Sequence, residues 1–127
     1  MSKLQTPFRY DFVGSFLRPQ ALKDAKAAYR DGKITKEEFD KVVNEEITKV
    51  VEKQKELGFH AITDGEFRRT FWHLDFMWGF DGVAHENTGN GVKFDAELAV
   101  LDDTYLVGKI KAKAHPFVEY FKFLKQF

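Results

Sequence analysis

The sequence predicts an α/β fold in which parallel strands alternate with helices. Residues 10–17 are typical of a short strand, residues 59–63 of a buried strand, and helical patterns occupy the chain between them. Strand, helix, strand is the order of a βαβ unit, and such units build parallel sheets. The chain of 127 residues is near the usual size of one domain, so we expect residues 1–127 to form a single domain.

The first predicted strand leads into a short helix. Gly14 and Ser15 lie at the exit of the strand. Pro19 follows at a place where proline favours the first helical turn, because its fixed φ suits the helix. Apolar residues at helical spacing then continue from Leu22, and Asp31–Gly32 supplies the turn chemistry that ends the helix.

The next helix has the clearest local signals in the chain. Thr35 and Glu38 match a capping box, in which each side chain accepts a hydrogen bond from the backbone of the other residue. Gly58 stands where a helix C-cap is expected. The spacing predicts a helix of about 20 residues with one apolar stripe. The stripe consists of Phe39, Val42, Val43, Ile47, Val50 and Val51.

The second half of the chain is rich in aromatic residues and turns. An apolar run bounded by Gly58 and Gly65 predicts the second strand. After it we expect a helix at 67–78, a loop or hairpin at 79–91, two antiparallel strands at 92–100 and 103–114, and an amphipathic segment opened by Pro116.

Composition narrows the function classes. Lys plus Arg equals Asp plus Glu at 20 each, which argues against binding nucleic acid or a membrane surface through bulk charge. The absence of cysteine excludes disulfides and thiolate metal ligands within the chain. No apolar run approaches the roughly 20 residues that span a bilayer, and the amino terminus lacks a secretory apolar stretch. We therefore expect a cytoplasmic protein.

Two loops follow the predicted strands and are candidates for a binding site. In a parallel sheet the loops at the carboxyl ends of strands form the ligand crevice. Backbone N–H groups at Gly14 and Ser15 suit a carboxylate, and the carboxylate of Glu66 suits an ammonium group. Together they predict a site for a zwitterion such as an amino acid.

The same residues have a plainer interpretation. Gly14 and Gly65 can be turn glycines, with Asp64 and Glu66 paired to Arg68 and Arg69 on a solvated surface. The four histidines lack metal-ligand spacing. The aromatic run at 71–80 is typical of a core, and it also suits the wall of a pocket for a flat ring.

The motifs VGSFLRP and GKITKEEFDKVVNEEITKVVEKQKELGFHAITDGEFRR carry a family resemblance. The Gly-Ser strand exit, the helix pair, the Q-x-x-LG helix end, the strand and the GE loop follow one another in the same order. The chain resembles the amino-terminal part of the catalytic barrel of cobalamin-independent methionine synthases, and it is most similar to their short bacterial paralogues.

The resemblance implies a (β/α)₈ barrel that transfers a methyl group from a methyl-folate to homocysteine. In the family a zinc ion binds the homocysteine thiol and lowers its pKa. By resemblance, Gly14 and Ser15 hold the amino acid's carboxylate and Glu66 holds its amino group. Asp64, Arg68 and Arg69 would support this site or contact the second substrate.

Two departures from the family shape the expectation. Asp64 stands where the true synthases have histidine, and at this position the short paralogues resemble this chain. A (β/α)₈ barrel needs about 250 residues. We therefore expect a partial TIM barrel, made of the first two βα units plus an inserted β-hairpin. Such a truncated piece holds no zinc of its own, because the family's zinc ligands lie outside it, and is inert alone.

Two alternatives remain. Exposed strand edges and apolar helix faces favour a self-associating module, either a homo-oligomer or one half of a pair with a complementing chain. The aromatic run and the charged loop favour a small protein that binds an amino acid or a folate without catalysis.

Overall fold

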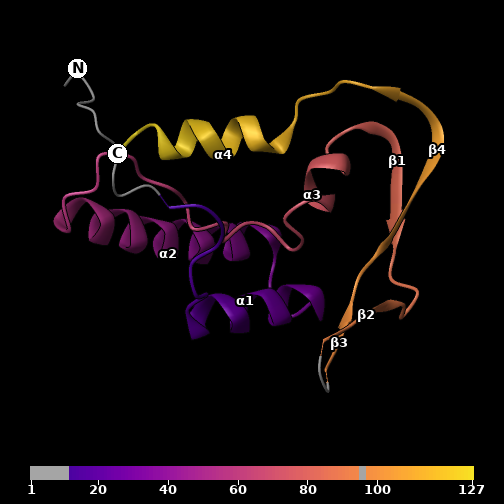
Figure 1. The fold of residues 1–127 in the computed structure, drawn as a ribbon, viewed down its shortest axis with the longest axis horizontal. Coiled ribbons are helices and arrows are strands. Elements are labelled where there is room, and N and C mark those ends of the chain that lie inside the picture. Colours follow the sequence, from indigo (N-terminus) through magenta and orange to yellow (C-terminus); the bar gives the residue numbers. More distant parts are fainter. Residues whose placement is uncertain (1–11, 95–96) are drawn as a thin grey trace. The chain divides into compact units, whose positions relative to one another are not determined.

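The computed structural model describes residues 12–94 and 97–127. Packing of the chain defines two compact units, the first ending at Arg68 and the second spanning Arg69–Gln126. Figure 1 shows the order of the elements along the chain. They are α1 (Gln20–Arg30), α2 (Lys36–Glu56), α3 (Leu74–Met77), β1 (Asp81–Glu86), β2 (Gly91–Phe94), β3 (Glu97–Val100), β4 (Asp103–Lys111) and α4 (Pro116–Leu124).

The boundaries of α1 and α2 confirm the predictions made from capping residues. Pro19 is the N-cap of α1 and Asp31 its C-cap. Thr35 is the N-cap of α2, where its hydroxyl accepts the Glu38 N–H at 3.2 Å and the Glu38 carboxylate accepts the Thr35 N–H at 2.8 Å. The capping box is therefore complete and satisfies two N–H groups that the helix itself leaves unpaired.

The carboxyl end of α2 is closed by Gly58. This residue has φ +79°, the left-handed region that glycine enters without steric cost. The Gly58 N–H donates to the Lys55 carbonyl at 3.0 Å, and the Phe59 N–H donates to the Gln54 carbonyl at 3.1 Å. This pair of bonds is the Schellman arrangement, which turns the chain sharply out of the helix.

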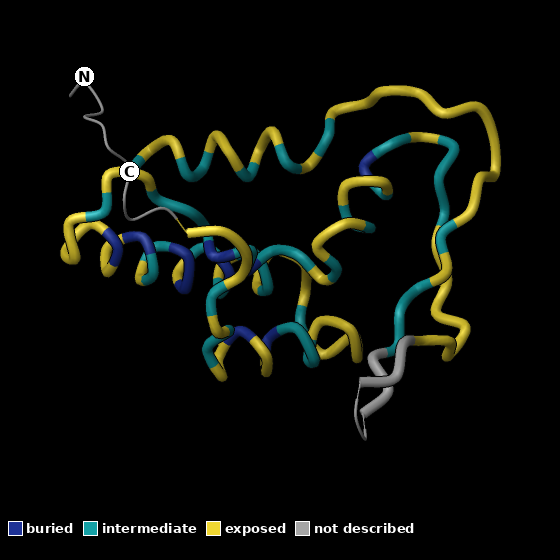
Figure 2. Tube along the Cα trace, in the orientation of Figure 1, coloured by how far each residue is buried: buried dark blue, intermediate teal, exposed yellow. Residues whose placement is uncertain are grey.

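The core of the first unit lies between α1 and α2. Val43, Ile47 and Val51 recur every four residues, so their side chains share one face of α2 and are fully buried. Leu22 and Ala25 are the buried residues of α1. Figure 2 shows these buried positions in dark blue on the two neighbouring helices. The remaining members of the predicted stripe, Phe39, Val42 and Val50, are half-buried.

Within the described residues, no strand forms at either position predicted for the first unit. Residues 12–17 and 59–63 contain no strand, while residues 10 and 11 lie outside the described part. A strand needs a neighbour for its N–H and C=O groups. At Thr63 that role falls to the Gln54 side chain, whose amide bonds both the N–H and the C=O. The predicted parallel pairing is therefore wrong for the residues described here.

The described part of the second unit contains two antiparallel sheets of two strands each. β1 pairs with β4, with Val83 opposite Leu106 and His85 opposite Thr104. The register shifts between Asp81 and Val83, at Gly82. β2 pairs with β3, with Val92 opposite Ala99.

The sequence placed these strand partners incorrectly. It predicted two strands at 92–100 and 103–114. In the structure, residues 92–100 contribute to both β2 and β3, and β4 pairs with β1, which lies in the segment predicted to be a loop or hairpin. The expected inserted hairpin is therefore replaced by two strand pairs.

The predicted helix at 67–78 shortens to α3. The Asp75 carboxylate accepts the N–H groups of Thr70 and Phe71, both at 2.8 Å. An aspartate that bonds the backbone upstream of itself favours a turn over a continued helix. At the end of the chain, Pro116 opens α4 as predicted, and His115 is its N-cap, with Nδ1 accepting the Phe117 N–H at 3.2 Å.

Candidate functional site

The candidate site is the turn from Thr63 to Arg68, which follows α2 at the end of the first unit. The Thr63 hydroxyl accepts the Gly65 N–H at 3.2 Å, and Asp64 Oδ1 accepts the Glu66 N–H at 2.9 Å. The Phe67 N–H donates to the Asp64 carbonyl at 3.3 Å. These local bonds fold the segment into a tight turn whose polar residues organise their own backbone.

The segment that contains Gly14 and Ser15 lies against this turn. The Phe16 N–H donates to the Gly65 carbonyl at 3.1 Å. The Arg18 guanidinium donates through Nη2 to the Glu66 carbonyl at 3.2 Å. The structure thus brings together the two segments that the sequence analysis proposed as halves of one site, although no sheet joins their described residues. Gly14 and Ser15 are exposed and Glu66 is half-buried.

Gly65 is required by close packing. It is buried, and a Cβ placed on it would lie 2.9 Å from Cδ2 of Phe16 and 3.0 Å from Cε1 of Phe67. Its φ of +66° is also a region that side chains disfavour. The close approach of the Phe16 segment and the positive φ therefore each favour glycine at this position of the GE motif.

The other candidate residues bond groups within the turn, on α2 and in the second unit. Asp64 bonds the Glu66 backbone, and Arg68 donates to the side chain of Asn44 on α2. Arg69 begins the second unit, where it donates to the Trp72 carbonyl at 3.3 Å and its guanidinium lies 4.9 Å from the centre of the Phe117 ring. Asp64 and Arg68 therefore shape the turn.

Two residues that hold this turn were not singled out from the sequence. Gln54 is buried on α2 and Arg18 lies just before Pro19. The signal for Gln54 was present in the Q-x-x-LG motif, whose glutamine is the residue that bonds Thr63. For Arg18 the signal was only its place in VGSFLRP, because its partner is distant in the sequence.

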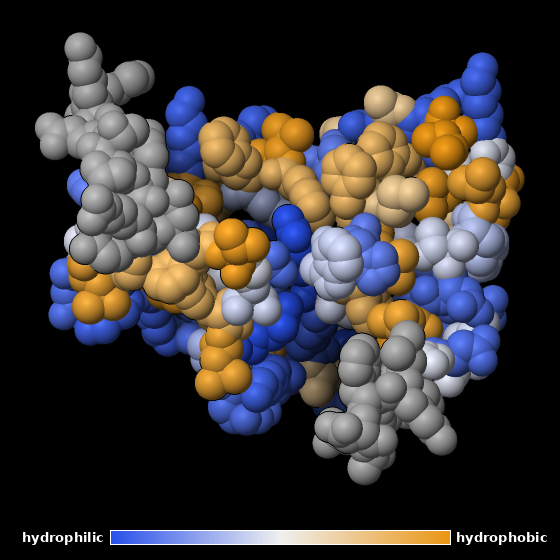
Figure 3. Space-filling view, in the orientation of Figure 1, coloured by the Kyte–Doolittle hydropathy of each residue, from blue (hydrophilic) through white to orange (hydrophobic). Residues whose placement is uncertain are grey.

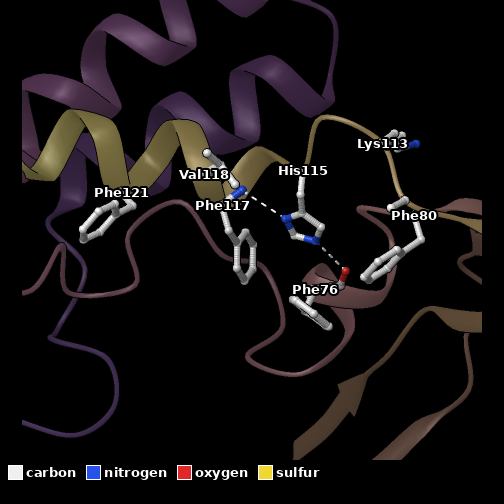
Figure 4. Close-up of a pocket in the computed structure, with 8 residues that line it drawn as sticks. Phe76, Phe80, Lys113, His115, Phe117, Val118 and Phe121 are labelled. Carbon is white, nitrogen blue, oxygen red and sulfur yellow. Dashed lines mark hydrogen bonds between the residues drawn. The ribbon is translucent and has the colours of Figure 1, made fainter.

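The second unit contains an apolar groove of about 470 Å³ between α3 and α4. Figure 4 shows the rings of Phe76, Phe80, Phe117 and Phe121 around it. The imidazole of His115 donates from Nε2 to the Phe76 carbonyl at 2.9 Å while its Nδ1 accepts the Phe117 N–H, which fixes the neutral tautomer. Part of the aromatic run, namely Phe76 and Phe80, therefore lines this groove.

The described residues do not fit a zinc site. Among residues 12–94 and 97–127 no three His, Asp or Glu side chains are grouped so that they can hold a metal ion. The sequence contains no cysteine, so thiolate ligands cannot come from this chain.

None of the described helices is long and apolar enough to cross a membrane.

Residues 9–94 match the family described as the catalytic domain of cobalamin-independent synthases. This match covers more than half of the chain. The chain belongs to this family. The resemblance predicted from the Gly-Ser strand exit, the Q-x-x-LG helix end and the GE loop is thereby confirmed.

Similar proteins match different shares of the chain. The uncharacterized protein YxjH of Bacillus subtilis is 39% identical over 122 residues, which cover 96% of this chain and 32% of YxjH. A 5-methyltetrahydropteroyltriglutamate–homocysteine methyltransferase of Thermotoga maritima is 34% identical over 77 residues, covering 61% of this chain and 10% of that enzyme.

A solved structure supports the fold of the family. It is a crystal structure from Listeria monocytogenes that is assigned as a vitamin-B12-independent methionine synthase. It matches 94% of this chain and 32% of its own chain, with 43% identity and a TM-score of 0.72. The chain thus spans about a third of the length of the relatives that it matches most fully.

Proposed function

We propose that this chain supplies the amino-acid-binding part of a methyltransferase that moves a methyl group from a methyl-folate to homocysteine. The observation that carries the proposal is the contact between the Gly14–Ser15 segment and the Glu66 turn, in a member of this family. Methionine, the product of such a transfer, is the second ligand that the site would take.

In the proposed site each charge of the amino acid has its own partner. Gly14 and Ser15 are exposed, and their backbone N–H groups would suit a carboxylate, since N–H donors in a turn form anion-binding concavities. The Glu66 carboxylate would accept hydrogen bonds from the ammonium group. Charge-assisted bonds of this kind are about twice as strong as neutral ones.

The chemistry of the methyl transfer would need more than this chain. Zinc would bind the thiol in a complete family member, and its ligands would come from polypeptide other than this chain. We propose that the chain corresponds to the first two βα units of a (β/α)₈ barrel with an inserted β segment, as its share of its relatives' length suggests. On this proposal the chain alone binds the amino acid and does not transfer the methyl group.

The test is a titration of the chain with methionine and with its des-amino analogue, 4-(methylthio)butanoate, followed by calorimetry. We expect methionine to bind at least tenfold more tightly, because the analogue lacks the ammonium group and cannot form the charge-assisted hydrogen bond to Glu66. Glu66→Gln should remove most of that preference. Equal binding of the two ligands, or binding of neither, would contradict the proposal.

A second candidate function rests on the groove in the second unit. Its volume of about 470 Å³ and its four phenylalanine rings suit a planar ring such as a pterin. In that case the chain would be a folate-binding module. Binding of tetrahydrofolate that Phe121→Ala weakens and Glu66→Gln does not would favour it. Unchanged binding in Phe121→Ala would remove it.

A further inference from the structure

Glu66 has an unusual backbone conformation. Its φ is +59°, and among the residues that the structure describes it is the one non-glycine residue with positive φ. A left-handed conformation is sterically unfavourable for an L-residue, because its Cβ comes too close to the following carbonyl oxygen. Such strain persists only where the surrounding structure imposes it, and it is concentrated at functional sites. The groups that impose it on Glu66 can be identified from its neighbours.

Gln54 fixes the start of the turn. Its side chain is only 3% exposed, and its amide makes two bonds to Thr63, with Nε2 donating to the carbonyl at 2.8 Å and Oε1 accepting the N–H at 2.9 Å. The same Nε2 also donates to the Val50 carbonyl at 3.1 Å, which anchors the amide on α2. Two bonds at one residue fix both its position and its orientation.

Arg18 and Phe16 fix the end of the turn. The Phe16 N–H holds the Gly65 carbonyl, and the Arg18 guanidinium holds the Glu66 carbonyl. Between these anchors the Glu66 N–H is held by Asp64. The Glu66 peptide groups are therefore bonded on both sides while the residue has its left-handed conformation.

We propose that Gln54 and Arg18 are positioning residues that hold Glu66 in its left-handed conformation and so place its Cα–Cβ bond for ammonium recognition. The recognition part of this inference rests on the proposed function. The side chains of Gln54 and Arg18 act through the backbone of the turn and do not contact the ligand. Selectivity for an amino acid over its des-amino analogue then depends on two residues outside the GE motif.

The first experiment measures the rate of amide hydrogen exchange at the residues of the turn, in the isotopically labelled chain. In Gln54→Met, which keeps the side-chain volume, we expect exchange at Thr63, Gly65 and Glu66 to accelerate at least tenfold relative to the amides around Ile47. Val51→Ala is the matched control, because it weakens the same helix face without touching these bonds. It should leave the ratio unchanged.

A second variant, Arg18→Met, tests the same inference if Gln54→Met does not fold. Arg18→Met leaves the α1–α2 core intact and should accelerate exchange at Glu66, with a change in its HN–Hα coupling. Unchanged exchange ratios and coupling in the folded variants would overturn the inference.

The second experiment repeats the methionine and 4-(methylthio)butanoate titrations with the same variants. We expect the preference for methionine to fall at least fivefold in Gln54→Met and Arg18→Met, and to stay at the wild-type value in Val51→Ala. A preserved preference in variants whose turn has loosened overturns the recognition part. A wild type with a protected turn and no preference overturns the proposed function instead.

Discussion

At the scale of single residues, the informative positions are those where the backbone is forced into a rare conformation. Gly58 and Gly65 have positive φ without a steric cost, because they carry no Cβ. Glu66 also has a positive φ, although it carries a Cβ. A residue that is chosen against its own conformational preference is more informative about function than a glycine in the same conformation.

Replacement of Glu66 separates stability from binding. We expect Glu66→Gly to raise the free energy of unfolding by about 0.5–1 kcal/mol, because the left-handed strain is relieved and the extra freedom of glycine offsets part of the gain. Glu66→Gln keeps the strain and should leave stability within about 0.5 kcal/mol of the wild type. Urea unfolding of both variants checks this, and a Glu66→Gly variant less stable than Glu66→Gln would contradict it.

At the scale of elements, helix ends follow from side chains that are close in sequence. Thr35 and Glu38 close the amino end of α2, and Gly58 follows its carboxyl end. The turn between α1 and α2 adds a cluster of charges, since Lys33 and Arg30 both bond the Asp31 carboxylate. These local groups give two predictions about helix stability.

Removal of the Thr35 cap should destabilise the first unit. We expect Thr35→Ala to lower the free energy of unfolding by about 1 kcal/mol, since the Glu38 N–H then loses its acceptor. Thr35→Ser retains the hydroxyl and serves as the control, with a smaller loss. Thermal unfolding followed by circular dichroism measures both, and equal losses in the two variants would show that the capping bond does not contribute.

Asp31 should make stability depend on pH in acid. The pKa of Asp31 is held below its ordinary value of 3.8. The main causes are the hydrogen bond from Lys33 and the positive charge of Lys33, and Arg30 adds a weaker effect. A carboxyl whose pKa is lower in the folded state stabilises the fold above about pH 3.8, and this contribution is lost as the pH falls through the folded-state pKa.

As the pH is lowered from 5 through the folded-state pKa of Asp31, the urea midpoint of the wild type should therefore fall toward that of Asp31→Asn. The fall should be smaller in high salt, because the Asp31 carboxylate is exposed and its interactions are screened. A constant difference between the two proteins over this range would count against the Asp31 contribution.

At the scale of the whole molecule, the chain leaves much apolar surface exposed. Large apolar side chains that face solvent include Leu106, Val107 and Ile110 on β4 and Val118 and Phe121 on α4. Figure 3 shows such hydrophobic surface, in orange, over several parts of the visible face. As far as the structure describes the chain, each sheet has two strands, so each of these strands also has an open edge.

Exposed apolar surface and open edges predict self-association. We expect light scattering to give a mass above that of the 14.8 kDa chain, with the association weakened by the paired change Val118→Glu and Phe121→Glu. Lys122→Glu changes charge on the same helix at an exposed position and is the control. A wild type that remains monomeric at high concentration would exclude the homo-oligomer.

The parts of the fold that could be predicted from the sequence depend on neighbours within a few residues. The boundaries of α2 follow from Thr35, Glu38 and Gly58, and the start of α4 from Pro116. The strands could not be placed, because β1 and β4 are stabilised by each other across a long stretch of chain. The helix predicted at 67–78 was wrong because Asp75 bonds the backbone before it.

The candidate site divides in the same way. Asp64, Gly65 and Glu66 were recognised because the motif is contiguous, and their turn is built largely from bonds among themselves. That the Phe16 segment lies beside them was inferred from a parallel sheet, yet in the described residues the contact forms without one. The contribution of Arg18 was missed, because nothing near it in the sequence indicates a bond to the Glu66 carbonyl.

The bond between the Gln54 side chain and Thr63 has a consequence for protein engineering. A helix residue supplies the turn with the pairing that a separate strand would otherwise provide. Part of the geometry of the GE turn is therefore encoded in the helix that precedes it. A designer who transplants this turn into another scaffold has to graft the last turn of α2 together with it, since a loop copied from Thr63 onward would lose the anchor at its first residue.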